Sequence, residues 1–306
     1  MVAGVEIVRK NILITGATGF LGQVVLNKLL DNSEYYFYII MRPNSNTKII
    51  TSNRHRMSQF EAVSIEDPRE LPQKLSKKRI DIFLHLATNY GRNSESIAQI
   101  LEANLILPLS LLKLAISNDS CHFINIDSFY NKPGNFQDRL FDYSQSKAAL
   151  IPWLKKEVNQ IRVSNLILEH MYGPDDKQHK IIPKLIASAK LNYQDGLKLS
   201  PGKQLRDFVF VEDVASAIEI IIENEPEVNL GYQDIEVGTG EARTLIYLSK
   251  VINKILGINV PAPFSLSAYP DDEIMSSYAD THILKSLGWG PSHSLESGLR
   301  KTIGDL

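Results

Sequence analysis

The sequence predicts an α/β fold in which a doubly wound parallel sheet carries helices on both faces. Short, fully apolar runs recur along the first half of the chain, and segments with helical periodicity separate them. Strands that are apolar throughout are typical of a parallel sheet covered on both sides. The 306 residues, 43% of them hydrophobic, are enough for one large domain or two smaller ones.

Six segments predict the strands, because they are apolar and rich in β-branched or aromatic residues. They are residues 11–15, 35–41, 60–65, 80–87, 122–127 and 162–168. Helical patterns cover residues 20–31, 94–117 and 142–160. The most apolar stretch, 103–116, is interrupted by Pro108, Ser110 and Lys113, and we expect a core helix there, not a membrane span.

The second half is less regular. We expect a helix at 181–191, a short strand leading into a helix over 206–223, and an amphipathic helix at 245–257 that ends at Gly257. Residues 1–168, with about 205–228 returning to them, are predicted to form a nucleotide-binding domain. Residues 169–204 and 229–306 are predicted to form a smaller, interleaved substrate domain.

The composition excludes several classes of partner. The formal net charge of −2 gives no reason to expect nucleic acid or an anionic membrane as a partner. The one cysteine, Cys121, cannot form an intramolecular disulfide, and no signal peptide precedes Asn11, so we expect a cytoplasmic protein. The histidines lack the spacing of metal ligands, and we expect no metal site.

A glycine-rich loop follows the first predicted strand. The stretch "TGATGFLG" places Gly16, Gly19 and Gly22 between a strand and a helix. Glycine permits the tight turn there and lets the backbone approach a pyrophosphate, which the free N–H groups of the helix N-terminus would bind. A glycine-rich turn without a ligand is the plainer alternative, but this context favours a Rossmann-type dinucleotide site.

The end of the second strand indicates which dinucleotide binds. NAD sites place an acidic residue there to hold the ribose 2′-hydroxyl. This chain has "IIMRPNSN", with Arg42 in that place and Asn44 and Ser45 beside it. Because arginine binds phosphate with two parallel hydrogen bonds, NADPH is favoured. An arginine that is merely solvated at the strand end is the alternative.

Tyr143 and Lys147 are the candidate catalytic pair. They lie four residues apart in "YSQSK", so a helix would place them on one face. A nearby ammonium stabilises phenolate and lowers the pKa of a phenol from its usual value of about 10. Ser128, which directly follows the predicted strand 122–127, could donate a second hydrogen bond to the same substrate oxygen.

Together these motifs resemble the extended short-chain dehydrogenase/reductase superfamily, the NAD-dependent epimerase/dehydratase group that acts on nucleotide sugars. "DIFLHLAT", "FINIDS", "YGPDD" and "RDFVFVEDVASAI" also match it in order. Within it, "HLATNYGR", "NIDSFYNK" and "LEHMYGPDD" are most similar to bacterial CDP-sugar 4-ketoreductases of lipopolysaccharide O-antigen assembly. Relatives in the superfamily are usually homodimers, so the resemblance implies a homodimer.

The resemblance implies further contacts in two groups. Those with the cofactor are Thr18, Phe20, Leu21, Ser64, Ile65, Leu86, Ala87, Thr88, Asn104 and His170. Those with the substrate are Asn89, Tyr90, Ser128, Phe129, His170 and Arg206. Some have simpler interpretations: His170 as a structural histidine, Tyr90 as a packing aromatic, and Arg206 in a salt bridge with Asp207 or Asp213. His85 is expected in the core.

Departures from the family pattern narrow the expected reaction. Dehydratases follow their catalytic Thr with an Asp-Glu pair, whereas Phe129 and Tyr130 follow Ser128 here. Asp127 is expected on the other face of its strand. The sequence therefore predicts NADPH-dependent reduction of the C4 ketone of a nucleotide-linked deoxyhexose. The alternatives are an NAD-retaining nucleotide-sugar 4-epimerase and a non-catalytic NADP-binding redox sensor, which generally lacks the Tyr–Lys pair.

Overall fold

The computed structural model describes residues 9–75, 77–92, 94–118, 122–135, 140–224 and 230–304. Cys121 lies outside these ranges. Contacts divide the chain into two compact units. The first takes the described residues of Met1–Asp127, Leu140–Leu166 and Glu225–Asp234, and the second takes those of Ser128–Arg139, Ile167–Asn224 and Ile235–Leu306.

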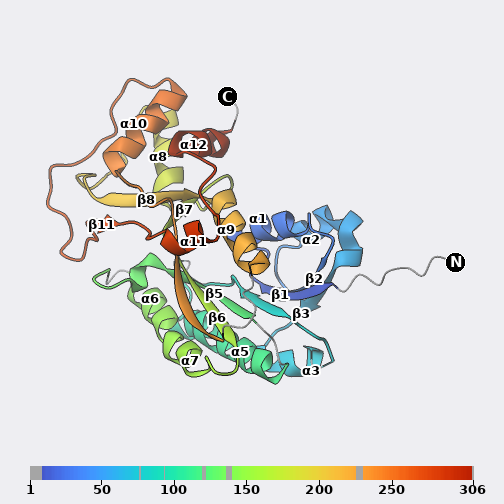
Figure 1. Cartoon of the computed structure of the whole chain (residues 1–306). Helices are drawn as coiled ribbons and strands as arrows, with labels where there is room; N and C mark the ends of the chain where they lie inside the picture. Colours follow the sequence, from blue (N-terminus) through green and yellow to red (C-terminus); the bar gives the residue numbers. More distant parts are fainter. Residues whose placement is uncertain are drawn as a thin grey trace. The chain divides into compact units, whose positions relative to one another are not determined.

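A seven-stranded sheet in the order β3-β2-β1-β4-β5-β6-β9 is the main sheet of the fold (Figure 1). Its strands are β1 (Lys10–Thr15), β2 (Tyr35–Met41), β3 (Phe60–Ser64), β4 (Ile82–His85), β5 (His122–Ser128), β6 (Arg162–Leu168) and β9 (Gly231–Val237). The pairs from β3 to β5 are all parallel. The predicted α/β class and the six predicted strands are confirmed, because long apolar runs mark strands buried on both faces.

Helices of the first unit cover both faces of this sheet. They are α1 (Phe20–Leu29), α2 (Lys48–Ser52), α3 (Leu71–Leu75), α4 (Ile97–Leu101), α5 (Leu107–Ser117), α6 (Phe141–Ala148) and α7 (Ile151–Lys156). Figure 1 places α1 and α2 on one face and α3, α5, α6 and α7 on the other. Short 3₁₀ turns add η1 (Arg54–Gln59) and η2 (Pro68–Glu70) to this unit, and a third, η4 (Phe129–Asn131), belongs to the second unit.

A π-helical turn, η3 (Glu102–Ile106), joins α4 to α5. It ends two residues before Pro108, which has no N–H to donate to the carbonyl of Asn104 and whose ring would clash with that carbonyl in a regular helix. The whole run Ile97–Ser117 is long and apolar enough to cross a membrane, a property that buried core helices share. Leu111, Leu112 and Ala115 are buried in the core, as predicted for this stretch.

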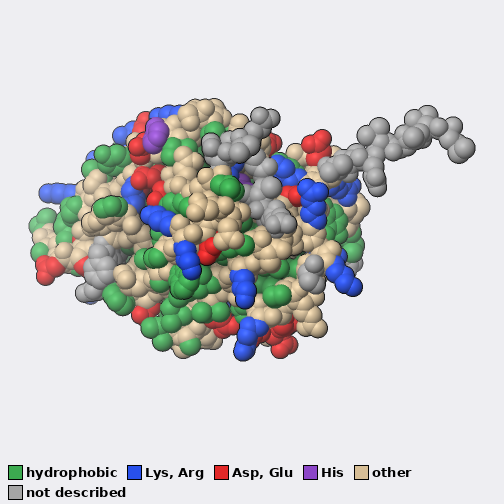
Figure 2. Space-filling view, turned by 60° about the horizontal axis from the view of Figure 1, so that its bottom comes forward, with side chains coloured by type: hydrophobic (Ala, Val, Ile, Leu, Met, Phe, Trp, Pro, Cys, Tyr) green, Lys and Arg blue, Asp and Glu red, His purple; other side chains and the backbone are tan. Residues whose placement is uncertain are grey.

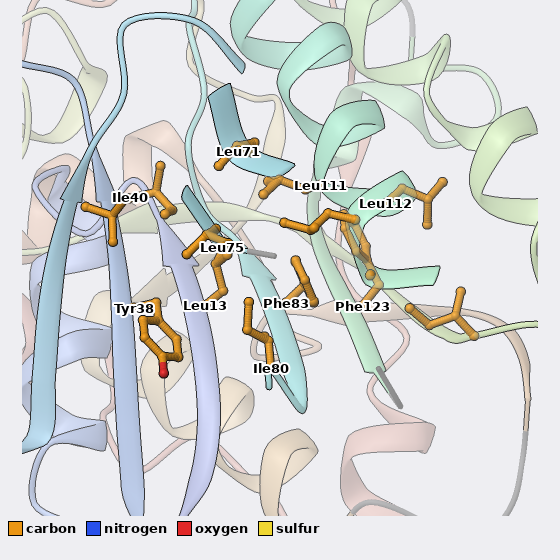
Figure 3. Packing of buried hydrophobic residues seen from close by; sticks show 14 of the residues in the cluster. Leu13, Tyr38, Ile40, Leu71, Leu75, Ile80, Phe83, Leu111, Leu112 and Phe123 are labelled. Carbon is orange, nitrogen blue, oxygen red and sulfur yellow. The ribbon is translucent and has the colours of Figure 1, made fainter. Parts of the chain in front are cut away.

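The apolar core of the first unit lies between the sheet and the helices α3, α5 and α7. In Figure 3, Leu13, Phe83 and Phe123 project from neighbouring strands toward the leucines of α3 and α5. The rings of Phe83 and Phe123 stack with their centroids 6.4 Å apart. Because β4 and β5 pair with Phe83 beside Phe123, residues two positions further along each strand, His85 and Asn125, are also neighbours on this face.

The second unit is built on a smaller sheet around β8 (Leu205–Phe210). β7 (His170–Tyr172) and β11 (Ser276–Ser277) pair with it in parallel, and β10 (Ala242–Thr244) pairs antiparallel. The helices are α8 (Ile181–Lys190), α9 (Val211–Glu223), α10 (Leu245–Leu256), α11 (His282–Ser286) and α12 (Leu295–Ile303). Gly257 ends α10 in the left-handed conformation, with φ of 67°, as predicted.

The observed division of the chain differs from the expected one in four places. Residues 128–135 and 167–168, expected in the nucleotide-binding domain, group with the second unit. Residues 205–224, expected to return to the nucleotide-binding domain, group with the second unit because β8 is the centre of its sheet. Residues 231–234, expected in the substrate domain, lie in β9 and belong to the first unit. β9 reads "GYQDIEV" and is partly exposed, so it lacks the continuous apolar run that marked the other strands.

Candidate active site

The glycine loop joins β1 to α1 as predicted. Gly16 has φ of +72°, which favours glycine, and a Cβ there would lie 2.5 Å from the backbone nitrogen of Ala87. A Cβ at Gly22 would lie 2.0 Å from the carbonyl oxygen of Gly16. The loop is therefore packed too closely for side chains at these positions. Its helix has no acidic residue in the first turn, so an anion could approach the N-terminus.

Arg42 follows β2 at the same edge of the sheet. Its backbone N–H donates to the Ser45 hydroxyl (3.1 Å), which closes a turn and leaves the side chains of Arg42 and Asn44 exposed. Among the described residues, no ion pair of the Arg42 guanidinium is found. Met41 pairs with Ser64 on β3, and Ile65 is buried beyond it. The predicted residues after β2 and β3 thus lie together, and an exposed, uncompensated arginine fits a phosphate ligand.

Asn104 connects the loop after β4 to helix α6. Its side-chain oxygen accepts hydrogen bonds from the hydroxyl of Thr88 (3.2 Å) and the backbone N–H of Asn89 (2.8 Å). Its amide nitrogen donates to the carbonyl of Asn89 (2.8 Å) and to the hydroxyl of Ser146 (2.9 Å). This buried asparagine lies in the π-helical turn before Pro108, a feature common at functional sites. It holds the loop against the turn of α6 that carries Lys147.

His85 has the structural role that the sequence suggested. Its Nδ1 lies 2.9 Å from the hydroxyl of Thr15, and it is 1% exposed. Burial, and secondarily the charge of Lys147, lowers the pKa of His85 to about 3, so the ring is neutral at physiological pH. Leu86 and Ala87 follow it, and their backbone N–H groups donate to the carbonyl (3.2 Å) and hydroxyl (3.3 Å) of Thr15.

Tyr143 and Lys147 lie on one face of α6, and both are buried. The Lys147 Nζ lies 5.9 Å from the centroid of the Tyr143 ring and donates to the carbonyl of Ile126 (2.6 Å). Burial lowers the pKa of Lys147 to about 8, while the nearby Asp127 acts in the opposite direction. The ring of Tyr90 stacks on that of Tyr143 at 4.5 Å. This pairing brings a predicted substrate residue and the predicted catalytic phenol together.

In the second unit, Phe129 and His170 are in contact, with ring centroids 4.2 Å apart. Ser128 ends β5 just before Phe129, and its hydroxyl accepts from the N–H of Tyr130 (3.4 Å). Burial lowers the pKa of His170, which favours the neutral ring. The predicted residues that follow β5 and β6 therefore pack together.

Arg206 forms a salt bridge, but not with either partner of the alternative interpretation. It pairs with Glu273 at 2.5 Å, and both side chains are almost fully buried. Asp207 instead accepts hydrogen bonds from Thr239 and Gly240, and Asp213 accepts from Ser292 and His293. The alternative interpretation of Arg206, with Asp207 or Asp213 as its partner, was wrong, because loop backbone and side-chain groups already bind both carboxylates.

Several polar residues around the site were not singled out from the sequence. Ser146 is the hydroxyl that binds Asn104, and its place beside Lys147 was a usable signal. Glu169 is buried and accepts hydrogen bonds from Lys132 (3.0 Å) and Ser277 (2.8 Å). Asn165 binds Asp127 from the neighbouring strand. Glu169 and Asn165 had no distinguishing pattern, because their partners lie far away in the sequence.

The described residues hold no group of three or more His, Cys, Asp or Glu side chains suited to a metal ion. The polar groups that the structure does gather are a phenol, an ammonium, hydroxyls and amides, together with an anion-compatible loop. These groups suit proton transfer at a carbonyl or alcohol oxygen beside a bound dinucleotide.

Comparison with known proteins agrees with this arrangement. Residues 12–238 match the NAD dependent epimerase/dehydratase family. The CDP-abequose synthase of Salmonella muenchen is 34% identical over 97% of this chain and 98% of its own length, and that of Salmonella typhimurium is 32% identical over 97% and 99%. Among solved structures, the dTDP-glucose 4,6-dehydratase from Bacillus anthracis in complex with NAD superposes with a TM-score of 0.76 at 20% identity, covering 96% of this chain and 95% of that one.

The match to the family covers most of the chain, and the relatives extend over nearly all of it. The Rossmann-like fold, the glycine loop and the Tyr–Lys pair are consistent with a short-chain dehydrogenase/reductase that modifies nucleotide sugars. The chain belongs to the NAD dependent epimerase/dehydratase family.

Proposed function

We propose that the protein catalyses NADPH-dependent reduction of the C4 ketone of a nucleotide-linked deoxyhexose, with CDP-4-keto-3,6-dideoxyglucose as the first candidate substrate. The observation that carries the proposal is the buried Tyr143–Lys147 pair on α6. Similarity to two CDP-abequose synthases supports the CDP-sugar substrate and a place in O-antigen sugar biosynthesis.

The residues present fit a dinucleotide. The close-packed glycine loop exposes the N-terminus of α1 to a pyrophosphate, and Arg42 is available for a 2′-phosphate. Lys147 has two N–H donors left for ribose hydroxyls after its bond to Ile126. When bound, the reduced nicotinamide supplies the hydride for C4 of the sugar.

The protein's own part in the reaction is proton delivery. The Tyr143 hydroxyl donates its proton to the oxygen at C4 as that oxygen gains negative charge. The ammonium of Lys147 stabilises the negative charge that develops on the phenol oxygen. We assign Ser128 a second hydrogen bond to the same substrate oxygen. His170 and Arg206 are proposed to bind the nucleotide diphosphate, with Arg206 also paired to Glu273.

Two departures from the dehydratase pattern favour reduction. Phe129 and Tyr130 occupy the positions of the Asp-Glu pair that eliminates water, so neither can act as carboxyl acid or base. Arg42 stands where a retained NAD would be held by a carboxylate, which supports an exchangeable NADPH. An NAD-retaining nucleotide-sugar 4-epimerase is the second candidate, since the matched family includes epimerases.

The deciding experiment offers NADPH with a panel of CDP-, dTDP- and GDP-linked 4-keto-6-deoxy and 3,6-dideoxy sugars. We expect absorbance at 340 nm to fall with at least one CDP-linked 4-keto sugar and product NMR to give one C4 configuration. Cofactor that remains bound through gel filtration, with C4 inversion of an ordinary nucleotide sugar, would instead establish the epimerase. Binding of NADPH without turnover of any nucleotide sugar would support the redox sensor.

We also propose a homodimer. Exposed apolar side chains at Ile97, Ile106, Phe141 and Trp153 lie on the adjoining helical segments from α4 to α7. Figure 2 shows hydrophobic side chains mixed with Lys and Arg on the face turned forward in that view. Light scattering of the full chain and of Trp153→Glu tests this: the variant should lower the mass from dimer to monomer.

A further inference from the structure

A buried polar cluster lies on the sheet face beside α6, and the proposed mechanism does not use it. Its buried members are Asn125 and Asp127 on β5 and Asn165 on β6, and the exposed Asp234 on β9 lies at its outer edge. Asp127, Asn125 and Asn165 are each at most 3% exposed, in the same layer as an apolar core. Buried charges and amides are costly unless they are paired, so this cluster calls for a physical explanation.

Asn165 is the centre of the cluster. Its side-chain nitrogen donates to Asp127 Oδ2 (3.2 Å) and to Asp234 Oδ1 (2.8 Å), while its oxygen accepts from the amide of Asn125 (2.7 Å). Tyr232 donates its hydroxyl to the same oxygen of Asp234 (2.6 Å). The Asn165 amide thus binds two carboxylates from different strands. The buried one of the two, Asp127, which we call the inner carboxylate, is fixed in position.

The inner carboxylate is next to the lysine of the candidate catalytic pair. Lys147 donates to the carbonyl of Ile126, the residue that directly precedes Asp127. A buried lysine near neutral pH can lose its proton, and a neutral amine has only two N–H donors and no positive charge. An opposite charge close by favours the ammonium.

We propose that Asp127 is a positioning residue whose buried carboxylate, held by Asn165, is the counter-charge that keeps Lys147 an ammonium with three donors. Only the consequence of this proposal rests on the function proposed above. That consequence is that the cofactor ribose and the Tyr143 phenol both interact with a charged Lys147. The charge relation itself involves neither substrate nor cofactor.

Other groups that face Lys147 do not supply this charge. His85 on β4 is neutral because burial lowers its pKa to about 3, and Tyr143 on α6 is the proton donor of the proposed reaction. Glu102 on η3 and Asp142 on α6 are exposed, so solvent screens them. The charge of Asp127 raises the pKa of Lys147 against the larger, opposite effect of burial, which leaves it at about 8.

The test measures the titration midpoint of Lys147 directly. The full chain, labelled with ¹³C at lysine Cε, is titrated by NMR without ligand, and the Lys147 signal is assigned from its loss in Lys147→Met. We expect the midpoint of Lys147 to fall by roughly one pH unit in Asp127→Asn, because one nearby opposite charge is worth about that much. Asp234→Asn is the matched control: it removes the same charge from the other carboxylate on Asn165 and should leave the midpoint unchanged.

A second variant and a second measurement keep the test decisive if Asp127→Asn fails to fold. Asp127→Ser should lower the midpoint as Asp127→Asn does, and in both variants NADPH binding, followed by fluorescence, should begin to weaken at a pH about one unit lower. Equal midpoints in the unmutated protein and in a folded Asp127 variant would overturn the proposal. Because the NMR titration needs no sugar substrate, a failure of the ketoreductase assay leaves its result intact, and the reverse also holds.

Discussion

The ring of Tyr90 stacks on the ring of Tyr143, with their centroids 4.5 Å apart and their planes inclined by 22°. Tyr143 is 4% exposed, whereas Tyr90 is 38% exposed. The loop that carries Tyr90 is itself fixed, because Asn104 binds Asn89 at both its N–H and its carbonyl. Tyr90 is therefore placed to hold the orientation of the Tyr143 phenol, the proposed proton donor.

Tyr90→Ala removes this stack, and we expect turnover to fall about 2- to 10-fold, since an aromatic pair is worth roughly 0.5–1.5 kcal/mol. Tyr90→Phe keeps the ring and its stack, so its turnover should stay close to that of the unmutated protein. Steady-state kinetics with NADPH measures both, and Tyr247→Ala, an exposed tyrosine on α10, is the control. Equal losses for the Ala and Phe variants would mean that the hydroxyl matters and the stack does not.

Tyr143→Phe removes the proposed proton donor and leaves the ring, its stack and Lys147 in place. Turnover should fall by roughly 10²–10⁴-fold, the usual worth of a positioned acid. NADPH binding, measured by fluorescence, should persist, because the lysine and the glycine loop are untouched. Full turnover in this variant would rule out the role assigned to Tyr143.

Arg42→Asp replaces a cation with an anion beside the proposed 2′-phosphate. The KM for NADPH should rise roughly 10- to 100-fold, because hydrogen bonds to charged groups contribute about 1.5–3 kcal/mol. The KM for NADH should change little. Lys113→Asp, on the exposed side of α5, makes the same change in net charge elsewhere. A parallel rise for both cofactors would show that Arg42 does not recognise the phosphate.

The sequence predicted the main sheet well because its central strands are uniformly apolar, as in β4 and β5. It missed β9, whose exposed Gln233 and Asp234 break the apolar run, and it missed the short strand β7. Both are held by pairing with strands that are distant in the sequence. Local patterns carry little information about such elements.

Among the candidate site residues, those within one local motif were the easiest to predict. Tyr143 and Lys147 share a helical face because they are four residues apart, and the glycines occupy one turn. The partner of Arg206 could not be predicted, since Glu273 lies 67 residues away and nearer carboxylates were available. Asp127 was expected only to face away from Ser128, and its link to Asn165 depends on the register of two strands.

The pair Arg206–Glu273 gives a prediction about stability. Arg206→Met leaves Glu273 buried without its counter-charge, and we expect the free energy of unfolding to fall by about 3–5 kcal/mol. The double variant Arg206→Met/Glu273→Met should regain most of this loss, because two apolar side chains can replace a buried pair. Urea denaturation at pH 7 measures both. A double variant no more stable than the single one would contradict this account.

Two neutral, buried histidines give a prediction about acid. Burial lowers the pKa of His122 and of His85 to about 3, against 6.5 in an unfolded chain. As the pH falls below about 6.5, the unfolded chain binds protons that the folded protein does not, so stability falls with falling pH until about pH 3. The slope is about 1.4 kcal/mol per pH unit for each histidine.

His122→Gln tests the contribution of one of these rings, since glutamine can still bond to Ser164, whose hydroxyl lies 2.8 Å from His122 Nε2. We expect urea denaturation between about pH 6 and pH 4.5 to show a weaker dependence of stability on pH in the variant. The slope should be smaller by about 1.4 kcal/mol per pH unit, the contribution of one histidine. His282→Gln, the same substitution at an exposed side chain, is the control for the exchange itself. If His122→Gln has the slope of the unmutated protein, the ring is protonated in the folded state and its burial does not keep it neutral.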